Sequence, residues 1–220
     1  MEDIQKHDIP LTGTHKTYLL WTAFVVGMSV MAIEMAASRL LTPHFGSSLY
    51  IWTNIIGVIM LALTVGYYLG GQMADRYTSP QFLYLAILAA GVYLFAMAFL
   101  AETTIRATLG LVSEHPLSIF FVSLLSTLPL FVIPFIFLGM VTPYIIKLRW
   151  QQAHSIGTNT GTAAACSTLG SIMGTFLPVF VSIPFLGTRR TIACFGTLLI
   201  LTALLGLLYS SRVHMHETEA

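Results

Sequence analysis

One acidic side chain of this sequence is placed where water has little access. Glu34 lies in an apolar run from Thr17 to Leu41, about seven residues from the end of that run, which corresponds to roughly 10 Å along a helix. A carboxylate at such a depth costs several kcal/mol unless it is neutral or faces a polar cavity or a cation. Intramembrane acids commonly mark substrate or proton paths, so we predict that Glu34 binds a positive ligand or carries a proton. A hydrogen bond to a neighbouring helix is the structural alternative.

Polar residues of the next apolar run could line the same route. Asn54 lies about four residues inside the run from Tyr50 to Gly71, which places it near the depth of Glu34 if the two helices are antiparallel neighbours. Thr64 and Tyr68 follow Asn54 at helical spacing and predict a face turned toward the bundle. Pore lining and ordinary hydrogen bonding between helices both explain this stripe.

Two basic residues follow Glu34 toward the expected mouth of the bundle. Arg39 is five residues further on, about 140° around an ideal helix, so it should not pair with Glu34 and should instead reach outward. Pro43 and His44 are expected in the turn that follows the helix. A histidine at such a mouth could titrate near neutral pH, whereas an ordinary loop position is the alternative.

The composition indicates that the apolar runs of this sequence are helices that span a membrane. Of 220 residues, 56% are hydrophobic and 9% are charged, compared with about 25% charged in ordinary soluble domains. A bilayer core needs roughly 20 helical residues per crossing, and continuous apolar runs argue against a transmembrane β-barrel. We therefore predict an all-α integral membrane protein with a cytoplasmic tail at residues 1–16, a membrane domain at 17–209 and a cytoplasmic tail at 210–220. Its six helices are expected at 17–41, 50–71, 81–100, 117–140, 157–180 and 191–209.

Small residues and prolines predict how these helices meet. Gly66 and Gly70, Gly157 and Gly161, and Gly170 and Gly174 have the G-x-x-x-G spacing, which lets helix backbones approach closely. Pro129 and Pro134 should kink the fourth helix where it faces protein or a cavity. An outer loop with a short surface helix is expected from Ala101 to Pro116.

A charged turn separates the second and third runs. Gly71, Ala74, Asp75, Arg76 and Tyr77 resemble the turn between the second and third helices of the major facilitator superfamily, whereas Thr78, Ser79 and Pro80 replace its usual glycine and basic pair. The resemblance implies a gating role for Gly71, Asp75 and Arg76. It also implies that this turn and both chain termini are cytoplasmic, an orientation that the distribution of Lys and Arg favours only slightly.

Four further blocks resemble the membrane domain of bacterial fused spermidine-synthase-like proteins. They are the segment from Glu34 through Ser38-Arg39-Leu40-Leu41 to Pro43, and the runs 138–143, 167–175 and 183–188. The resemblance implies one half of a major facilitator transporter in a bacterial inner membrane, and Pro143 is assigned a conformational role. The soluble aminopropyltransferase-like domain is missing, and no glycine-rich nucleotide loop is found, so catalysis by this chain is not expected.

These observations lead to two functional hypotheses. The first is a half-size transporter of a small cationic or zwitterionic, polyamine-like metabolite that works as a homodimer, because two six-helix halves build a complete transporter. The second is a membrane scaffold on which Lys147 and Arg149 dock a separate aminopropyltransferase-like protein. A net charge of +1 gives no case for nucleic-acid binding, and the seven scattered histidines give none for a metal or cofactor. Cys166 and Cys194 are expected as small packing residues.

Overall fold

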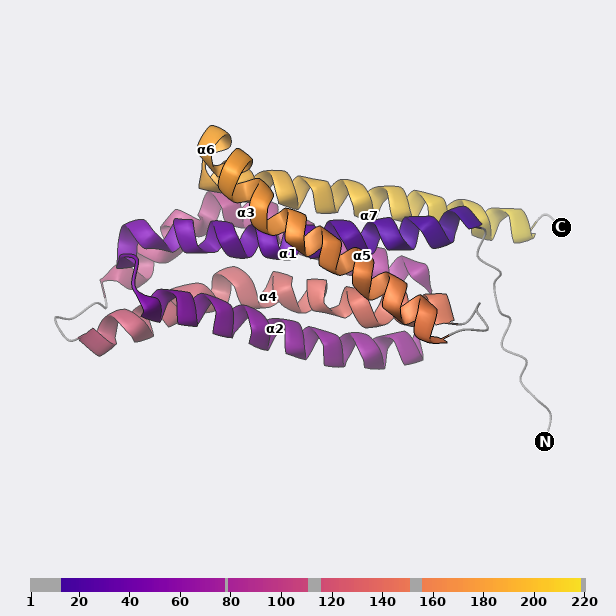
Figure 1. Ribbon diagram of the computed structural model, residues 1–220, viewed down its shortest axis with the longest axis horizontal. Helices are drawn as coiled ribbons and strands as arrows, with labels where there is room; N and C mark the ends of the chain where they lie inside the picture. Colours follow the sequence, from indigo (N-terminus) through magenta and orange to yellow (C-terminus); the bar gives the residue numbers. More distant parts are fainter. Residues whose placement is uncertain (1–12, 78, 111–115, 151–155, 219–220) are drawn as a thin grey trace.

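The computed structural model is an all-helical bundle (Figure 1) and describes residues 13–77, 79–110, 116–150 and 156–218. Its long helices are α1 (Gly13–Phe45), α2 (Leu49–Arg76), α3 (Pro80–Leu109), α4 (Pro116–Trp150), α5 (Ile156–Leu177) and α7 (Thr188–Thr218). A π-helical segment (Pro178–Ser182) and the short α6 (Ile183–Leu186) join α5 to α7. In the described part of the chain, six helical segments are long and apolar enough to span a membrane, with α5, the π-helical segment and α6 counted as one. The predicted all-α membrane architecture is thus confirmed at this level.

Several helices are longer than predicted. The expected turn at Pro43 and His44 is wrong, because α1 continues to Phe45 and ends where Gly46 (φ 82°) donates its N–H to the carbonyl of Thr42. A proline removes only one backbone hydrogen bond, and a left-handed glycine is the stronger stop signal. Helix α1 begins at Gly13 and α7 extends to Thr218, whereas the segments that are apolar enough to span a membrane run from Thr17 to Ser210.

The third and fourth helices differ from expectation in the same way. The predicted outer loop from Ala101 is helical as far as Leu109, because α3 does not stop at its first charged residues. Helix α4 continues past the predicted end at Met140 to Trp150 and contains three prolines, Pro129, Pro134 and Pro143. Its mostly apolar surface and its neighbours stabilise the helix against the lost backbone bonds.

The fifth predicted helix is divided. The α-helical part ends at Leu177, three residues before the predicted end, and Pro178 opens the π-helical segment. Gly187 (φ 81°) then ends α6 and turns the chain into α7, which begins at Thr188 rather than at the predicted Thr191. Positive φ is available to glycine at little cost, and this explains the sharp change of direction there.

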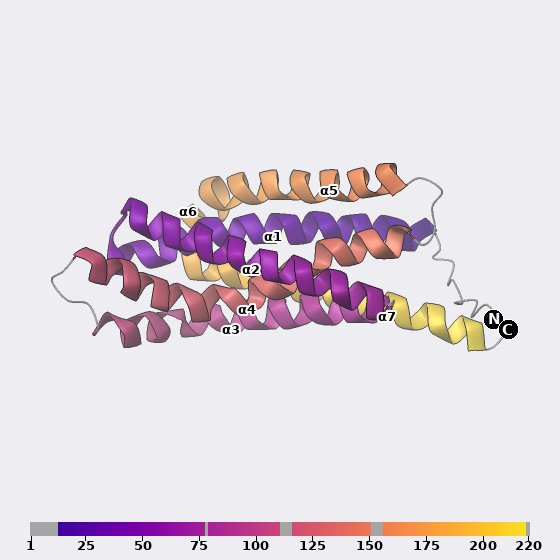
Figure 2. The same cartoon turned by 90° about the horizontal axis from the view of Figure 1, so that it is seen from below.

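The pairing of the helices follows an internal symmetry. Helix α2 packs against α4 as α5 packs against α1, α3 contacts α4 as α7 contacts α1, and α3 contacts α7. Exchanging α1, α2 and α3 with α4, α5 and α7 therefore reproduces the main contacts. Figure 2 shows the resulting layers: α5 lies over α1 on one side of the bundle, whereas α3 and α7 lie on the other side.

Glycines mark the two equivalent interfaces. A Cβ atom added at Gly66 or Gly70 of α2 would come closer than 3.0 Å to the backbone of α4 near Gly139. The same addition at Gly170 or Gly174 of α5 would meet the backbone of α1 beside Gly27. Gly161 differs from expectation, since it is exposed and a Cβ atom there would have no neighbour within 4 Å.

Candidate functional site

Glu34 lies in the middle of α1 and is partly buried. It is seven residues from Gly27, close to two helical turns, so it emerges from the side of α1 that α5 crosses at Ser167. Among the described residues, Glu34 has no hydrogen-bond or ion-pair partner, and the predicted lack of pairing with Arg39 agrees with this. A carboxyl group in this position can bind a cation or a proton.

Asn54 is buried against α4. Its exposed fraction is 4%, and its side-chain Nδ2 donates to the hydroxyl of Ser123 (2.8 Å) and to the carbonyl of Phe120 (2.9 Å). The Ser123 hydroxyl donates in turn to the same carbonyl. The structural alternative, hydrogen bonding between helices, therefore describes Asn54.

The remaining members of the predicted polar stripe, Thr64 and Tyr68, are exposed rather than packed against another helix. Thr64 is exposed and donates its hydroxyl to the carbonyl of Met60 in its own helix (2.8 Å), and Tyr68 is 68% exposed. The expectation that this stripe faces the bundle of a single chain is wrong. The Asn54 side of α2 packs on α4, whereas Thr64 and Tyr68 are available to lipid or to a second chain.

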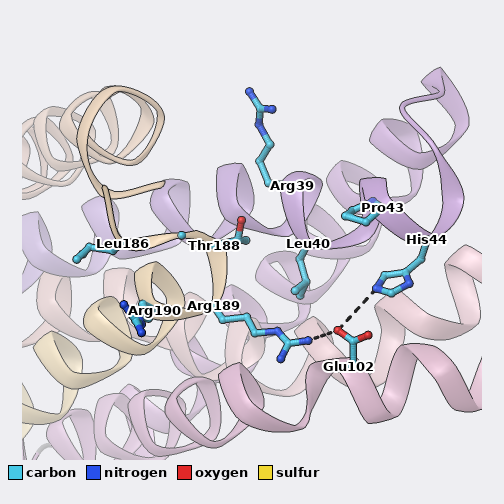
Figure 3. A pocket seen from close by; sticks show the side chains of 10 residues that line it. Arg39, Leu40, Pro43, His44, Glu102, Leu186, Thr188, Arg189 and Arg190 are labelled. Atoms are coloured by element: carbon cyan, nitrogen blue, oxygen red, sulfur yellow. Dashed lines mark hydrogen bonds and ion pairs between the residues drawn. The ribbon is translucent and has the colours of Figure 1, made fainter. Parts of the chain in front are cut away.

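A pocket lies at the opposite end of the bundle from Asp75, where α1 and α3 end and α7 begins (Figure 3). It has a volume of about 480 Å³. We call it the basic pocket, and its lining residues are Arg39, Leu40, Pro43, His44, Glu102, Leu186, Gly187, Thr188, Arg189 and Arg190. Both Arg39 and His44 line this pocket. Arg39 lies within α1 as predicted, whereas His44 belongs to the last turn of α1 rather than to a turn after it.

Glu102 is the centre of the ionic contacts at the basic pocket. Its Oε1 accepts a hydrogen bond from Arg106 Nε one helical turn further along α3 (2.7 Å), and its Oε2 accepts one from Arg189 Nη2 of α7. His44 Nε2 of α1 lies 3.9 Å from the same Oε2. Figure 3 shows Arg189 pointing toward Glu102, whereas Arg39 points away from it. One carboxylate thus joins α3 to α7, and the last turn of α1 lies beside it.

The Asp75 end of the bundle carries a second set of polar contacts. Lys147 Nζ of α4 donates to Asp75 Oδ1 of α2 (2.7 Å), and the Tyr144 hydroxyl, one residue after Pro143, contacts the carbonyls of Tyr77 and Ser79. Arg76 is exposed, and a Cβ atom at Gly71 would have no neighbour within 4 Å. These contacts tie the α2–α3 turn to the last turns of α4. The gating role of Gly71, Asp75, Arg76 and Pro143 stays a prediction.

The two basic residues expected to dock a partner are engaged within the chain. Lys147 contacts Asp75, and Arg149 Nη2 donates to Asn159 Oδ1 of α5 (3.2 Å). Both cysteines are free thiols, Cys166 partly buried and Cys194 exposed. Within the described residues, no group of three or more His, Cys, Asp and Glu side chains could hold a metal ion.

Sequence reasoning missed Glu102, Arg189 and Arg190 as site residues. The four-residue spacing of Glu102 and Arg106 is typical of an ion pair within a helix. It could have indicated that the third helix continues past residue 100, but the charged residues were interpreted as part of a loop. The meeting of Glu102 with Arg189 depends on α3 packing against α7, which spacing within one segment cannot indicate.

Comparison with known proteins gave no relative for this chain. No family model, no curated protein and no solved structure matches it significantly.

Proposed function

We propose that the chain is a half-size transporter of a small cationic or zwitterionic, polyamine-like metabolite, and that it works as a homodimer. The observation that carries this proposal is Glu34: it is partly buried at mid-helix, without a polar partner among the described residues. An ionised carboxylate in this environment is energetically costly. A cation or proton that binds Glu34 lowers this cost, and its reversible binding would be a step of transport. The Asp75 end is cytoplasmic in this proposal, as in the major facilitators that the sequence resembles.

The internal symmetry of the helix pairing supports a transporter. Two triplets with an odd number of crossings have opposite orientations in a membrane, and inverted repeats of this kind build many secondary transporters. The symmetric contacts join the triplets through α1 with α5 and α2 with α4. Small tilts between such paired helices provide a way to open one end of the bundle while the other end closes.

The uncovered faces of α2 and α5 support a dimer. The α5 span is the least buried of the six, and its free face carries small residues that include Gly157, Gly161 and Ala164. On α2, Thr64 and Tyr68 are exposed. A two-fold partner on this side would cover the polar stripe of α2 and the small residues of α5, which allow close approach.

Uptake into proteoliposomes tests the assignment of Glu34. The purified full chain is reconstituted, and uptake of labelled putrescine, spermidine and zwitterionic amino acids is compared with that of Glu34→Gln and Glu34→Asp proteins. We expect Glu34→Gln to lower uptake of the transported amine by at least about tenfold, since the charged contact is lost, and Glu34→Asp to retain part of it. Uptake that is unchanged in Glu34→Gln would remove this residue from the mechanism.

A further inference from the structure

The basic pocket holds more positive charge than its carboxylate balances. Three guanidinium groups, those of Arg39, Arg189 and Arg190, line it with the single carboxylate of Glu102. Glu102 already binds Arg189 and also Arg106, which is not a lining residue. Arg39 and Arg190 are exposed, and neither forms an ion pair with a described residue. Their charge is therefore available to an anion.

The position and walls of the pocket narrow the choice of anion. It lies where the membrane-length segments of α1 and α3 end and that of α7 begins. The ends of apolar spans reach the head-group level of a bilayer, where phosphate groups are abundant. Leu40, Pro43 and Leu186 add apolar surface beside the arginines, which suits a phosphate attached to an apolar or neutral group.

We propose that the basic pocket binds a phosphate group, either the head group of a phospholipid or a free phosphate. Guanidinium groups bind phosphate oxygens through paired, charge-assisted hydrogen bonds, and a volume of about 480 Å³ accommodates a phosphate with its substituent. Arg190 and Arg39 are the ligand-binding groups, and Arg39 reaches the pocket by rotation about its side-chain bonds. Glu102 is a positioning residue that holds Arg189 at the pocket. This site does not depend on the proposed transport function.

Two binding arms distinguish the sources of the phosphate. In the first, the full chain in neutral detergent micelles is titrated with phosphatidylglycerol, and retained lipid is measured by native mass spectrometry. In the second, inorganic phosphate is titrated and its binding is followed by the width of its ³¹P resonance. Arg190→Gln is compared with Arg106→Gln, which removes the same charge from an arginine that contacts Glu102 but does not line the pocket.

We expect Arg190→Gln to weaken binding about tenfold, Arg39→Gln with Arg190→Gln to weaken it further, and Arg106→Gln to change it less than about twofold. Arg190→Lys keeps the charge but loses the paired geometry of the guanidinium group, so its loss of binding should lie between those of Arg190→Gln and Arg106→Gln. Binding in the lipid arm alone assigns a head-group site, and binding of inorganic phosphate assigns a site for free phosphate. No binding in either arm, or an equal loss in Arg106→Gln, would overturn the proposal.

Discussion

Asn54 shows how a polar side chain inside an apolar helix can be a packing residue. Both donor hydrogens of its amide nitrogen are used by Ser123 and Phe120 of α4, so this nitrogen is satisfied without water. In an apolar interior, a lost partner leaves a polar group that cannot be hydrated. The amide therefore stabilises the α2–α4 interface and fixes its register near the Glu102 end of the bundle.

Replacing Asn54 by Ala is expected to lower the free energy of unfolding by about 1–2 kcal/mol, because the Ser123 hydroxyl and the Phe120 carbonyl of α4 each lose the hydrogen bond that Asn54 donates. Unfolding of the purified chain in mixed micelles measures the change. Thr64→Val is the control, since Thr64 is exposed and bonds only within its own helix, and it should stay within about 0.5 kcal/mol. Equal effects of the two substitutions would contradict this account. With Ser123→Ala, the loss from Asn54→Ala should shrink, because the two residues share one interaction.

At the scale of the elements, close contact between helix backbones depends on glycines at particular positions. Gly70 and Gly71 are adjacent in α2 but differ completely in their surroundings. A Cβ atom at Gly70 would lie 2.5 Å from the Cα atom of Met140 in α4, whereas one at Gly71 would have no neighbour within 4 Å. The pair therefore separates the effect of helix propensity from the effect of interhelical packing.

Gly70→Ala is expected to lower the free energy of unfolding by about 1–3 kcal/mol, since the added methyl group forces α2 away from α4. Gly71→Ala should instead raise it by up to about 1 kcal/mol, because alanine is the better helix former and nothing opposes its side chain. Unfolding in mixed micelles, with helicity followed by circular dichroism, measures both. Stabilisation by both substitutions would mean that the α2–α4 contact is looser than described.

The helices themselves could be predicted from the sequence, but their partners could not. The apolar runs were sufficient for six spans, because length and composition decide whether a helix can cross a membrane. Their ends were missed at Phe45 and Leu109, where the prediction gave Pro43 and the charges of Glu102 and Arg106 more weight than helical spacing. The basic pocket could not be predicted from the sequence for another reason. Residues of α1, α3 and α7 line it, and no local sequence pattern indicates which helices pack together.

At the scale of the whole molecule, the two sides of the bundle differ in how well they are covered. Helices α3 and α7 pack together on one side, whereas α5 lies alone over α1 on the other (Figure 2). The homodimer that we propose uses the α5 side. A bulky residue on the free face of α5 should therefore separate the two copies, and one on the free face of α7 should not.

Gly161→Trp is expected to shift the protein in lipid nanodiscs from dimer to monomer by at least about tenfold, because an indole ring prevents close approach of α5. Leu205→Trp, at a position of α7 that is 58% exposed, is the matched substitution and should leave the dimer intact. Native mass spectrometry of the nanodiscs counts the copies. A wild-type protein that is monomeric in lipid would exclude the dimer outright.

The partners of α1 have a consequence for the order in which the protein can be assembled. Its main neighbours are α5 and α7, which begin at Ile156 and Thr188 and leave the ribosome long after α1 has been inserted. Until then, the side of α1 that holds Gly27 and Glu34 has no permanent neighbour. The first helix therefore receives its main neighbours last, and a chain whose synthesis stops after α4 leaves the Glu34 side of α1 without the helix that covers it.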